Sequence, residues 1–163
     1  MNLLILPGNS IKNKAWAETV EDSVKELFDS TVVQNYDHWK AGKENIFFGQ
    51  ELEKLAKTVE FWAEYVILAK SVGVRLALET VNSGKAKPQR TIFIGTAWLP
   101  KLEKPEIPVL FIQHTSDPLL NAAELKAHLE KSGYTNYRFE ELPGNTHDYA
   151  EIDKIKQIIQ DYL

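Results

Sequence analysis

The chain has 163 residues, 44 % of them hydrophobic and 26 % charged, with a formal net charge of −4 and no cysteine. These values are typical of one soluble globular domain, which we expect to span residues 1–163. The absence of cysteine excludes disulfides, a catalytic thiolate and Cys-ligated zinc. The 19 Lys and Arg residues form no basic stripe, so nucleic acid is not an expected partner.

The apolar runs are all short, and none approaches the roughly 20 residues that cross a bilayer. We therefore expect no membrane partner. The chain begins with Met1-Asn2 and continues directly into "LLIL", without a basic leader or a long apolar stretch. This start is not typical of a secretory signal, so we expect the protein in the cytoplasm.

Apolar runs bounded by turn residues predict strands, and segments with an apolar residue at every third or fourth position predict helices. The predicted strands are residues 3–7, 31–36, 65–69, 91–95, 108–113 and 137–142, the last one at an edge of the sheet. The predicted helices are residues 15–29, 50–62, 72–83, 119–132 and 149–163. This alternation predicts a three-layer α/β/α fold with a mostly parallel sheet of about six strands. A loop at 99–108 is too short to be a lid domain.

Ligands of such sheets bind beyond the carboxyl ends of the strands. After the third predicted strand comes "AKSVG", in which Ser71 lies between a strand and a helix. Its neighbours at two positions to either side, Ala69 and Gly73, are small. This pattern is typical of a nucleophile elbow, where a strained turn lifts the serine hydroxyl above the sheet. The alternative is that Ser71 only caps the helix that follows.

A serine nucleophile needs a base and a carboxylate that orients the base. The fifth strand is followed by "HTSDPLL" with Asp117, and the sixth by "PGNTHDY" with His147. Ser, Asp and His at successive strand ends are less expected by chance than each residue alone. Asp117 precedes a proline, so it could instead cap a helix. Asp148, next to His147, is a second candidate for the orienting acid.

The other histidines are weaker candidates for the base. His38 ends the second strand, and His128 lies in a helix, where we expect it at the surface. His114 would place base and acid on the same loop, so we expect it to line the site at most.

The intermediate of acyl transfer needs two backbone N–H donors. We expect one from Val72, directly after the nucleophile, and one from the loop "LPGNS", with Asn9 preferred over Ser10. The alternative is a phosphate-binding loop, but a single glycine in five residues is far from a dinucleotide fingerprint or a P-loop.

These motifs resemble the α/β-hydrolase superfamily, and within it the small lidless serine hydrolases of the retinoblastoma-binding-protein-9 kind. The resemblance rests on "LLILPGNS" with Trp16, "VILAKSVG", "FIQHTSDPLL" and "PGNTHDY", and it spans almost the whole chain at low similarity. It implies a hydrolase without a metal or an organic cofactor. The implied site consists of Ser71 as nucleophile, His147 as general base, Asp117 as orienting acid, and Asn9 and Val72 as oxyanion donors.

The sequence departs from this pattern at two positions. Ala69 replaces a customary glycine, and Lys70 occupies a position where histidine is common. A cation beside the nucleophile could favour an anionic substrate, or could be held by a carboxylate such as Glu44 or Asp37.

The favoured function is a serine hydrolase that cleaves a small acyl ester, thioester or amide through an acyl-enzyme. Its substrate-binding residues are expected to be Lys70, Trp39, Trp98 and Leu99, in a shallow cleft. One alternative is a catalytically weak or inactive binding protein on the same scaffold. A less favoured one is a flavodoxin-like or nucleotide-binding protein whose "PGNS" loop holds phosphate. Both a monomer and a homodimer are compatible with the sequence.

Overall fold

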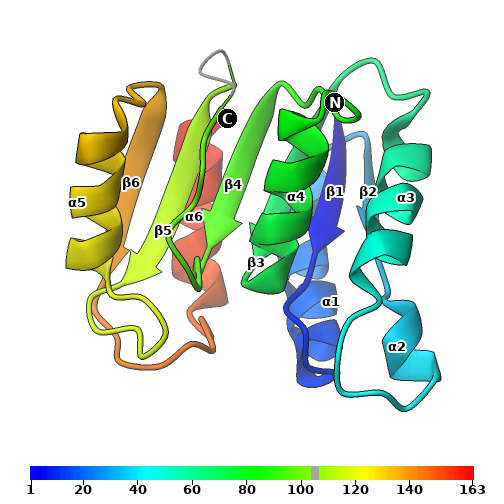
Figure 1. The fold of residues 1–163 in the computed structure, drawn as a ribbon, viewed down its shortest axis with the longest axis horizontal. Coiled ribbons are helices and arrows are strands. Elements are labelled where there is room, and N and C mark those ends of the chain that lie inside the picture. The colour runs from blue at the N-terminus through cyan, green and yellow to red at the C-terminus, as the bar shows by residue number, and fades with distance from the viewer. Residues whose placement is uncertain (104–106) are drawn as a thin grey trace.

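In the computed structural model, which describes residues 1–103 and 107–163, the strands form one parallel sheet in the order β2-β1-β3-β4-β5-β6 (Figure 1). The strands are β1 (Asn2–Leu6), β2 (Ser30–Val33), β3 (Tyr65–Lys70), β4 (Arg90–Ile94), β5 (Val109–His114) and β6 (Tyr137–Leu142). The predicted fold class is confirmed, and β6 lies at an edge as expected. The predicted loop at 99–108 falls partly outside the described residues.

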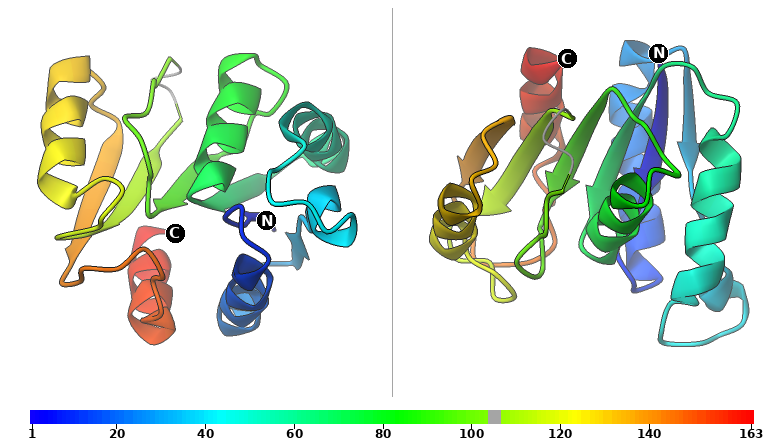
Figure 2. Two further views of the ribbon diagram at one scale, coloured as in Figure 1. Left: turned by 60° about the horizontal axis from the view of Figure 1, so that its bottom comes forward. Right: turned by 45° about the horizontal axis from the view of Figure 1, so that its top comes forward.

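Helices cover both faces of the sheet. They are α1 (Lys12–Val24), the 3-10 turn η1 (Lys25–Leu27), α2 (Asp37–Lys40), α3 (Phe48–Val59), α4 (Val72–Asn82), α5 (Ala122–Ser132) and α6 (Ile152–Tyr162). Helices α1 and α6 lie on one face, and α3, α4 and α5 lie on the other (Figure 2). The carboxyl ends of all strands point to the same edge, where α2 also lies.

Each face of the sheet has its own hydrophobic core because successive strand residues point to opposite faces. Leu4 and Leu6 of β1 pack toward α3, α4 and α5, whereas Leu3 and Ile5 pack toward α1 and α6. Every residue of β3 and β5 is buried. These two strands are continuous apolar runs for this reason, and they hold the loops at their carboxyl ends in fixed positions.

Several element boundaries differ from the prediction by a few residues. Helix α5 begins at Ala122 rather than at 119, because the Asn121 side chain accepts the Glu124 N–H at 2.9 Å and caps the helix there. Helix α6 begins at Ile152 rather than at 149, because Tyr149 has a left-handed backbone with φ of 54°. Helix α2 was not predicted at all.

No helix within residues 1–103 and 107–163 is both long enough and apolar enough to span a membrane.

Candidate active site

Ser71 forms a strained turn between β3 and α4. Its backbone has φ of 53° and ψ of −119°, which non-glycine residues rarely adopt, and its N–H donates to the Ile94 carbonyl at 3.2 Å. Gly73 has no room for a side chain, since a Cβ there would lie 2.3 Å from the Leu6 carbonyl oxygen. Ser71 makes no side-chain capping bond to α4. The Ser71 side chain therefore does not cap α4, and its strained backbone is of the kind that a nucleophile elbow requires.

Asp117 and His147 form a hydrogen-bonded pair. His147 Nδ1 lies 2.7 Å from Asp117 Oδ2, and Asp117 is only 4 % exposed. Because a carboxylate accepts, Nδ1 carries the proton and Nε2 keeps the lone pair that a base needs. Asp117 Oδ1 accepts the Leu119 N–H at 2.9 Å. The N-cap of α5 is Asn121, so Asp117 does not cap this helix.

Ser71 and His147 contact the same short stretch at the end of β4. Ser71 N–H binds Ile94, and a Cβ on Gly95 would lie 3.1 Å from His147 Cε1, the ring carbon between the two nitrogens. His147 Nε2 is buried and has no hydrogen-bond partner. The structure thus holds His147 and Ser71 around one strand end without a hydrogen bond between them. Catalytic hydrogen bonds often tighten only when substrate is bound.

Asn9 is held on all sides by the segment that contains α2. Its carbonyl oxygen accepts from His38 Nε2 at 2.9 Å and from Trp39 Nε1 at 2.7 Å. Its side chain donates to the Glu44 carbonyl at 2.7 Å and accepts the Ile46 N–H at 3.0 Å. In the described part of the chain its own N–H donates to no group. This N–H is therefore free to bind an oxyanion.

The second expected oxyanion donor, Val72, is the first residue of α4. The first N–H groups of a helix have no partner within the helix, and they carry the positive end of its dipole. On the other side of the loop, Asn13 Nδ2 donates to the Ser10 carbonyl at 3.2 Å. The loop around Asn9 is thus fixed from both flanks.

Lys70 is buried beside the nucleophile, with 4 % of its surface exposed. Its Nζ donates to Asn13 Oδ1 at 2.8 Å and lies 4.8 Å from the centre of the Trp16 ring. Burial lowers the pKa of Lys70 to about 8, although the charges of Asp148 and Asp117 act in the opposite direction. The residue before Ser71 is therefore a buried lysine that loses its proton at a lower pH than an exposed lysine does.

The prediction that Glu44 or Asp37 holds Lys70 is wrong. Asp37 forms an ion pair with Lys54 at 2.9 Å, and Glu44 contributes its backbone carbonyl to Asn9. No carboxylate of residues 1–103 or 107–163 lies within ion-pair distance of Lys70. That Lys70 contacts a substrate stays a prediction.

The remaining histidines have structural contacts. His114 is buried, and its Nδ1 and Nε2 lie 2.7 Å from the Thr146 carbonyl and 2.8 Å from Glu151 Oε1. His128 is half-buried rather than at the surface, and its Nε2 lies 2.7 Å from the Pro100 carbonyl. His114 lies next to the site, as expected, and His128 fastens the loop after β4 to α5.

Tyr149 is a site residue that sequence reasoning missed. It is fully buried, and its hydroxyl donates to Asp117 Oδ2 at 2.7 Å. Burial raises the pKa of this hydroxyl far above its ordinary value, so it stays protonated. Its position two residues after His147 was the available signal, but the residue was assigned to the last helix.

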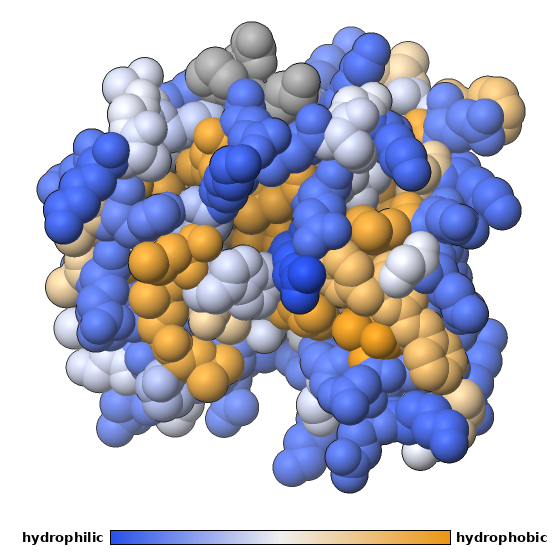
Figure 3. All heavy atoms as spheres, viewed as in Figure 1, coloured by the Kyte–Doolittle hydropathy of each residue, from blue (hydrophilic) through white to orange (hydrophobic). Residues whose placement is uncertain are grey.

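The expected lining residues lie in two separate hollows. Trp39 lines a hollow of about 480 Å³ together with Asn9, Ser10 and Ile11. Trp98 and Leu99 line another of about 480 Å³ beside α4. Apolar patches separated by hydrophilic side chains are visible on the face formed by α3, α4 and α5 (Figure 3).

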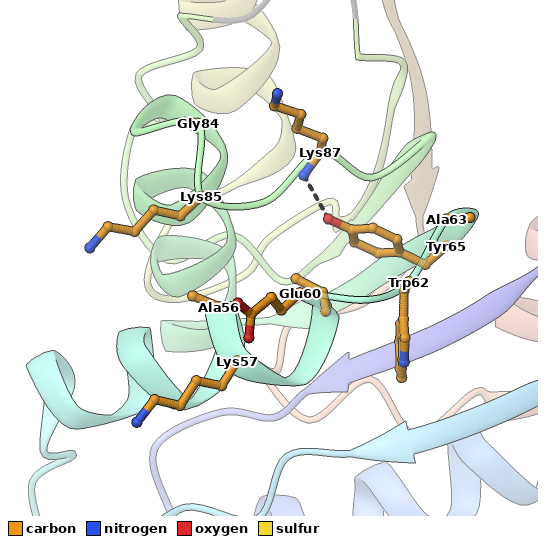
Figure 4. A pocket seen from close by; sticks show the side chains of 10 residues that line it. Ala56, Lys57, Glu60, Trp62, Ala63, Tyr65, Gly84, Lys85 and Lys87 are labelled. Carbon is orange, nitrogen blue, oxygen red and sulfur yellow. Dashed lines mark hydrogen bonds between the residues drawn. The ribbon is translucent and has the colours of Figure 1, made fainter.

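A hollow of about 620 Å³ lies at the opposite edge of the sheet, between the end of α3, the start of β3 and the loop after α4. Lys57, Lys85 and Lys87 line it, and the side chain of Lys87 points in a different direction from those of Lys57 and Lys85 (Figure 4). It is therefore not part of the site around Ser71. The described residues contain no group of three or more His, Asp and Glu side chains that could hold a metal ion.

The parallel sheet, its helical layers and the strained serine after β3 define the α/β-hydrolase fold, and solved structures confirm this. An alpha-beta serine hydrolase homologue from Coxiella burnetii has a TM-score of 0.79 at 16 % identity, over 100 % of this chain and 85 % of that one. A protein from Xanthomonas campestris assigned to the alpha/beta hydrolase superfamily has a TM-score of 0.73 at 13 % identity, over 99 % and 98 %. The RedJ thioesterase of the prodiginine pathway from Streptomyces coelicolor has a TM-score of 0.69 at 13 % identity, over 99 % of this chain and 85 % of that one.

No protein-family model matches the sequence, and no curated protein is significantly similar to it. The similarity to solved structures, at these low identities, establishes the fold. The expected resemblance to the α/β-hydrolase superfamily is confirmed at this level, and the closer resemblance to one group within it still rests on the sequence motifs.

Proposed function

We propose that the protein is a serine hydrolase that cleaves a small acyl ester, thioester or amide, and that it acts in the cytoplasm. The observation that carries this proposal is the strained elbow at Ser71 together with the bonded pair of His147 and Asp117 at the same strand ends. A backbone conformation this rare costs about 1–3 kcal/mol and persists where function needs it. The solved structures with the same fold include described hydrolases and a thioesterase, which supports the same reaction class.

In the proposed mechanism Ser71 Oγ attacks the carbonyl carbon, and His147 Nε2 takes the proton of the hydroxyl. Asp117 keeps the ring in the required tautomer and stabilises the imidazolium that forms. The N–H groups of Val72 and Asn9 bind the oxyanion. His147 then gives its proton to the leaving group, and water releases the acyl group from Ser71 by the same steps.

The hollow beside Asn9 supports the choice of a small substrate. It begins at the proposed oxyanion donor, so one arm of a substrate bound at Ser71 would extend along Trp39. The hollow at Trp98 and Leu99 is the proposed site of the other arm. Neither hollow is closed by a separate domain in the described residues, which fits a substrate that enters directly from solvent.

A fluorophosphonate probe tests the proposal, because it reacts with an activated serine. We expect it to label the wild-type protein, and we expect Ser71→Ala to abolish labelling and ester hydrolysis. The matched control is Ser83→Ala, at the far end of α4, which should label like the wild type. Labelling that survives Ser71→Ala, or a folded wild type that is not labelled at all, would sink the proposal.

A second candidate is a binding protein on the same scaffold with a vestigial triad. It is favoured by one observation, namely that His147 Nε2 has no partner and forms no hydrogen bond with Ser71. This candidate predicts no turnover of short-chain p-nitrophenyl esters above the rate of Ser71→Ala. Turnover that depends on Ser71 decides for the hydrolase.

A further inference from the structure

We propose that Tyr149 is a positioning residue of this site, whose hydroxyl shares the charge of Asp117 and thereby sets how strongly Asp117 supports a protonated His147. The proposal rests on the proposed hydrolase function. It assigns to Tyr149 no contact with substrate.

The hydroxyl of Tyr149 lies in the hydrogen-bond network of the acid. It donates to Asp117 Oδ2 at 2.7 Å, the same oxygen that accepts from His147 Nδ1 at 2.7 Å. The hydroxyl itself accepts the backbone N–H of His114 at 3.0 Å. Since that N–H occupies a lone pair of the phenol oxygen, the phenol proton is directed to Asp117.

The Asp117 carboxylate therefore receives three hydrogen bonds from the described residues. Leu119 N–H binds one oxygen, and Tyr149 and His147 share the other. Each donor stabilises negative charge on the carboxylate and leaves less of it to stabilise an imidazolium. The phenol and the imidazole thus donate to the same oxygen atom of Asp117. A ring that only filled space in the core would not need a hydroxyl at this position.

Tertiary contacts hold Tyr149 in a conformation that its own backbone disfavours. Its φ is 54°, and its carbonyl accepts from Trp16 Nε1 at 2.9 Å. Its ring stacks on the imidazole of His114 with centroids 4.0 Å apart and an interplanar angle of 15°. A Cβ on Gly95 would lie 2.4 Å from the Tyr149 ring. This left-handed backbone accompanies a ring that is fully buried only two residues after His147.

Other charged and titratable groups surround the pair of His147 and Asp117. Lys70 comes from β3, His114 from β5, Asp148 from the loop of the base itself, and Glu151 from the residue before α6. Tyr149→Phe removes no hydrogen bond from any of these four side chains, although the backbone N–H of His114 loses its acceptor. An effect of Tyr149→Phe on the pH dependence is thus assigned to the bond with Asp117.

The test compares Tyr149→Phe with Tyr162→Phe in the full chain. Tyr162 Oη is buried without a hydrogen-bond partner, so this control removes a phenol hydroxyl that binds no described group. For Tyr149→Phe we expect the acid limb of fluorophosphonate labelling to move to higher pH by about half a unit to one unit. At a fixed pH on the acid side of the midpoint, labelling should fall by roughly three- to tenfold. Tyr162→Phe should give the wild-type profile.

A measurement that does not need turnover separates this proposal from the proposed function. The titration of the His147 ring, followed by NMR, should move in the same direction in Tyr149→Phe, even if the wild type hydrolyses nothing. If the wild type is not labelled but the titration moves, only the hydrolase proposal fails. If the titration midpoint of folded Tyr149→Phe equals that of the wild type, the role of Tyr149 is overturned.

A second variant keeps the test decisive if Tyr149→Phe does not fold. Replacement of Tyr149 by 3-fluorotyrosine preserves the size of the ring and makes the phenol a stronger donor. It should move the acid limb and the His147 titration to lower pH, opposite to Tyr149→Phe. An unchanged profile with the fluorinated residue would contradict the proposal.

Discussion

Lys70 is a buried ammonium group with a single hydrogen-bond acceptor, Asn13, in the described part of the chain. Its pKa of about 8 lies below the ordinary value of 10.5, because burial penalises the charged form. The unfolded chain therefore holds this proton more tightly than the folded protein does. The contribution of Lys70 to the free energy of unfolding therefore rises with pH between about 8 and 10.5, and it is lowest below pH 8.

We expect Lys70→Met to be more stable than the wild type at pH 7, by up to about 3 kcal/mol. The rise in the free energy of unfolding above pH 8 should disappear in this variant. Urea unfolding at pH 7 and pH 9.5 measures both effects, and Lys85→Met, at an exposed position, is the matched control. A wild type that is equally stable at both pH values contradicts the assigned cause.

Sequence patterns predicted Ser71, Asp117 and His147 because each follows a predicted strand, and the structure brings them to the same edge of the sheet. Tyr149 escaped prediction for a physical reason. Its left-handed backbone results from contacts with Trp16 and Asp117, which lie 133 and 32 residues away in the chain. The local sequence around residue 149 favours a helix and does not predict these distant contacts.

The short helix α2 holds the loop that supplies the proposed oxyanion donor. It has four residues, about one turn, so no apolar period could reveal it in the sequence. Its side chains His38 and Trp39 both donate to the Asn9 carbonyl, 29 and 30 residues away. Strands and long helices were predictable from periodicity, whereas this element owes its place to tertiary hydrogen bonds.

We expect Trp39→Phe to lower kcat/KM roughly tenfold, since it removes one of the two donors that fix the Asn9 carbonyl and trims the indole that lines the proposed substrate hollow. A smaller aromatic ring replaces the indole, so an aromatic contact with Tyr36 should persist. Steady-state kinetics on a p-nitrophenyl ester measures the effect. Trp62→Phe, whose indole lies at the opposite edge of the sheet beside Tyr65, is the control. An equal loss in both variants would speak against a specific role of α2.

The molecule as a whole has two hydrophobic cores that share one sheet. Leu129 of α5 belongs to one core and Ile159 of α6 to the other, and both are fully buried. Because β1, β3, β4, β5 and β6 contribute side chains to both cores, we expect the two cores to unfold together.

We expect Leu129→Ala and Ile159→Ala each to lower the free energy of unfolding by roughly 2–5 kcal/mol, and each variant to unfold in a single transition. Circular dichroism and tryptophan fluorescence should give coincident curves. Phe61→Ala, at a side chain that is 89 % exposed, should change stability by less than about 0.5 kcal/mol. Separate transitions for the two core variants would show that the layers unfold independently.

Both chain ends lie at the edge of the sheet opposite to Ser71, as Figure 1 shows. A fusion partner, an affinity tag or a chemical tether at either end would therefore project away from the serine. Protein anchored to a bead or a sensor chip through Met1 or Leu163 would present its reactive loops to the surrounding liquid. The same arrangement would let two differently tethered preparations be compared directly, because neither linker would need to pass over the mouth of the site.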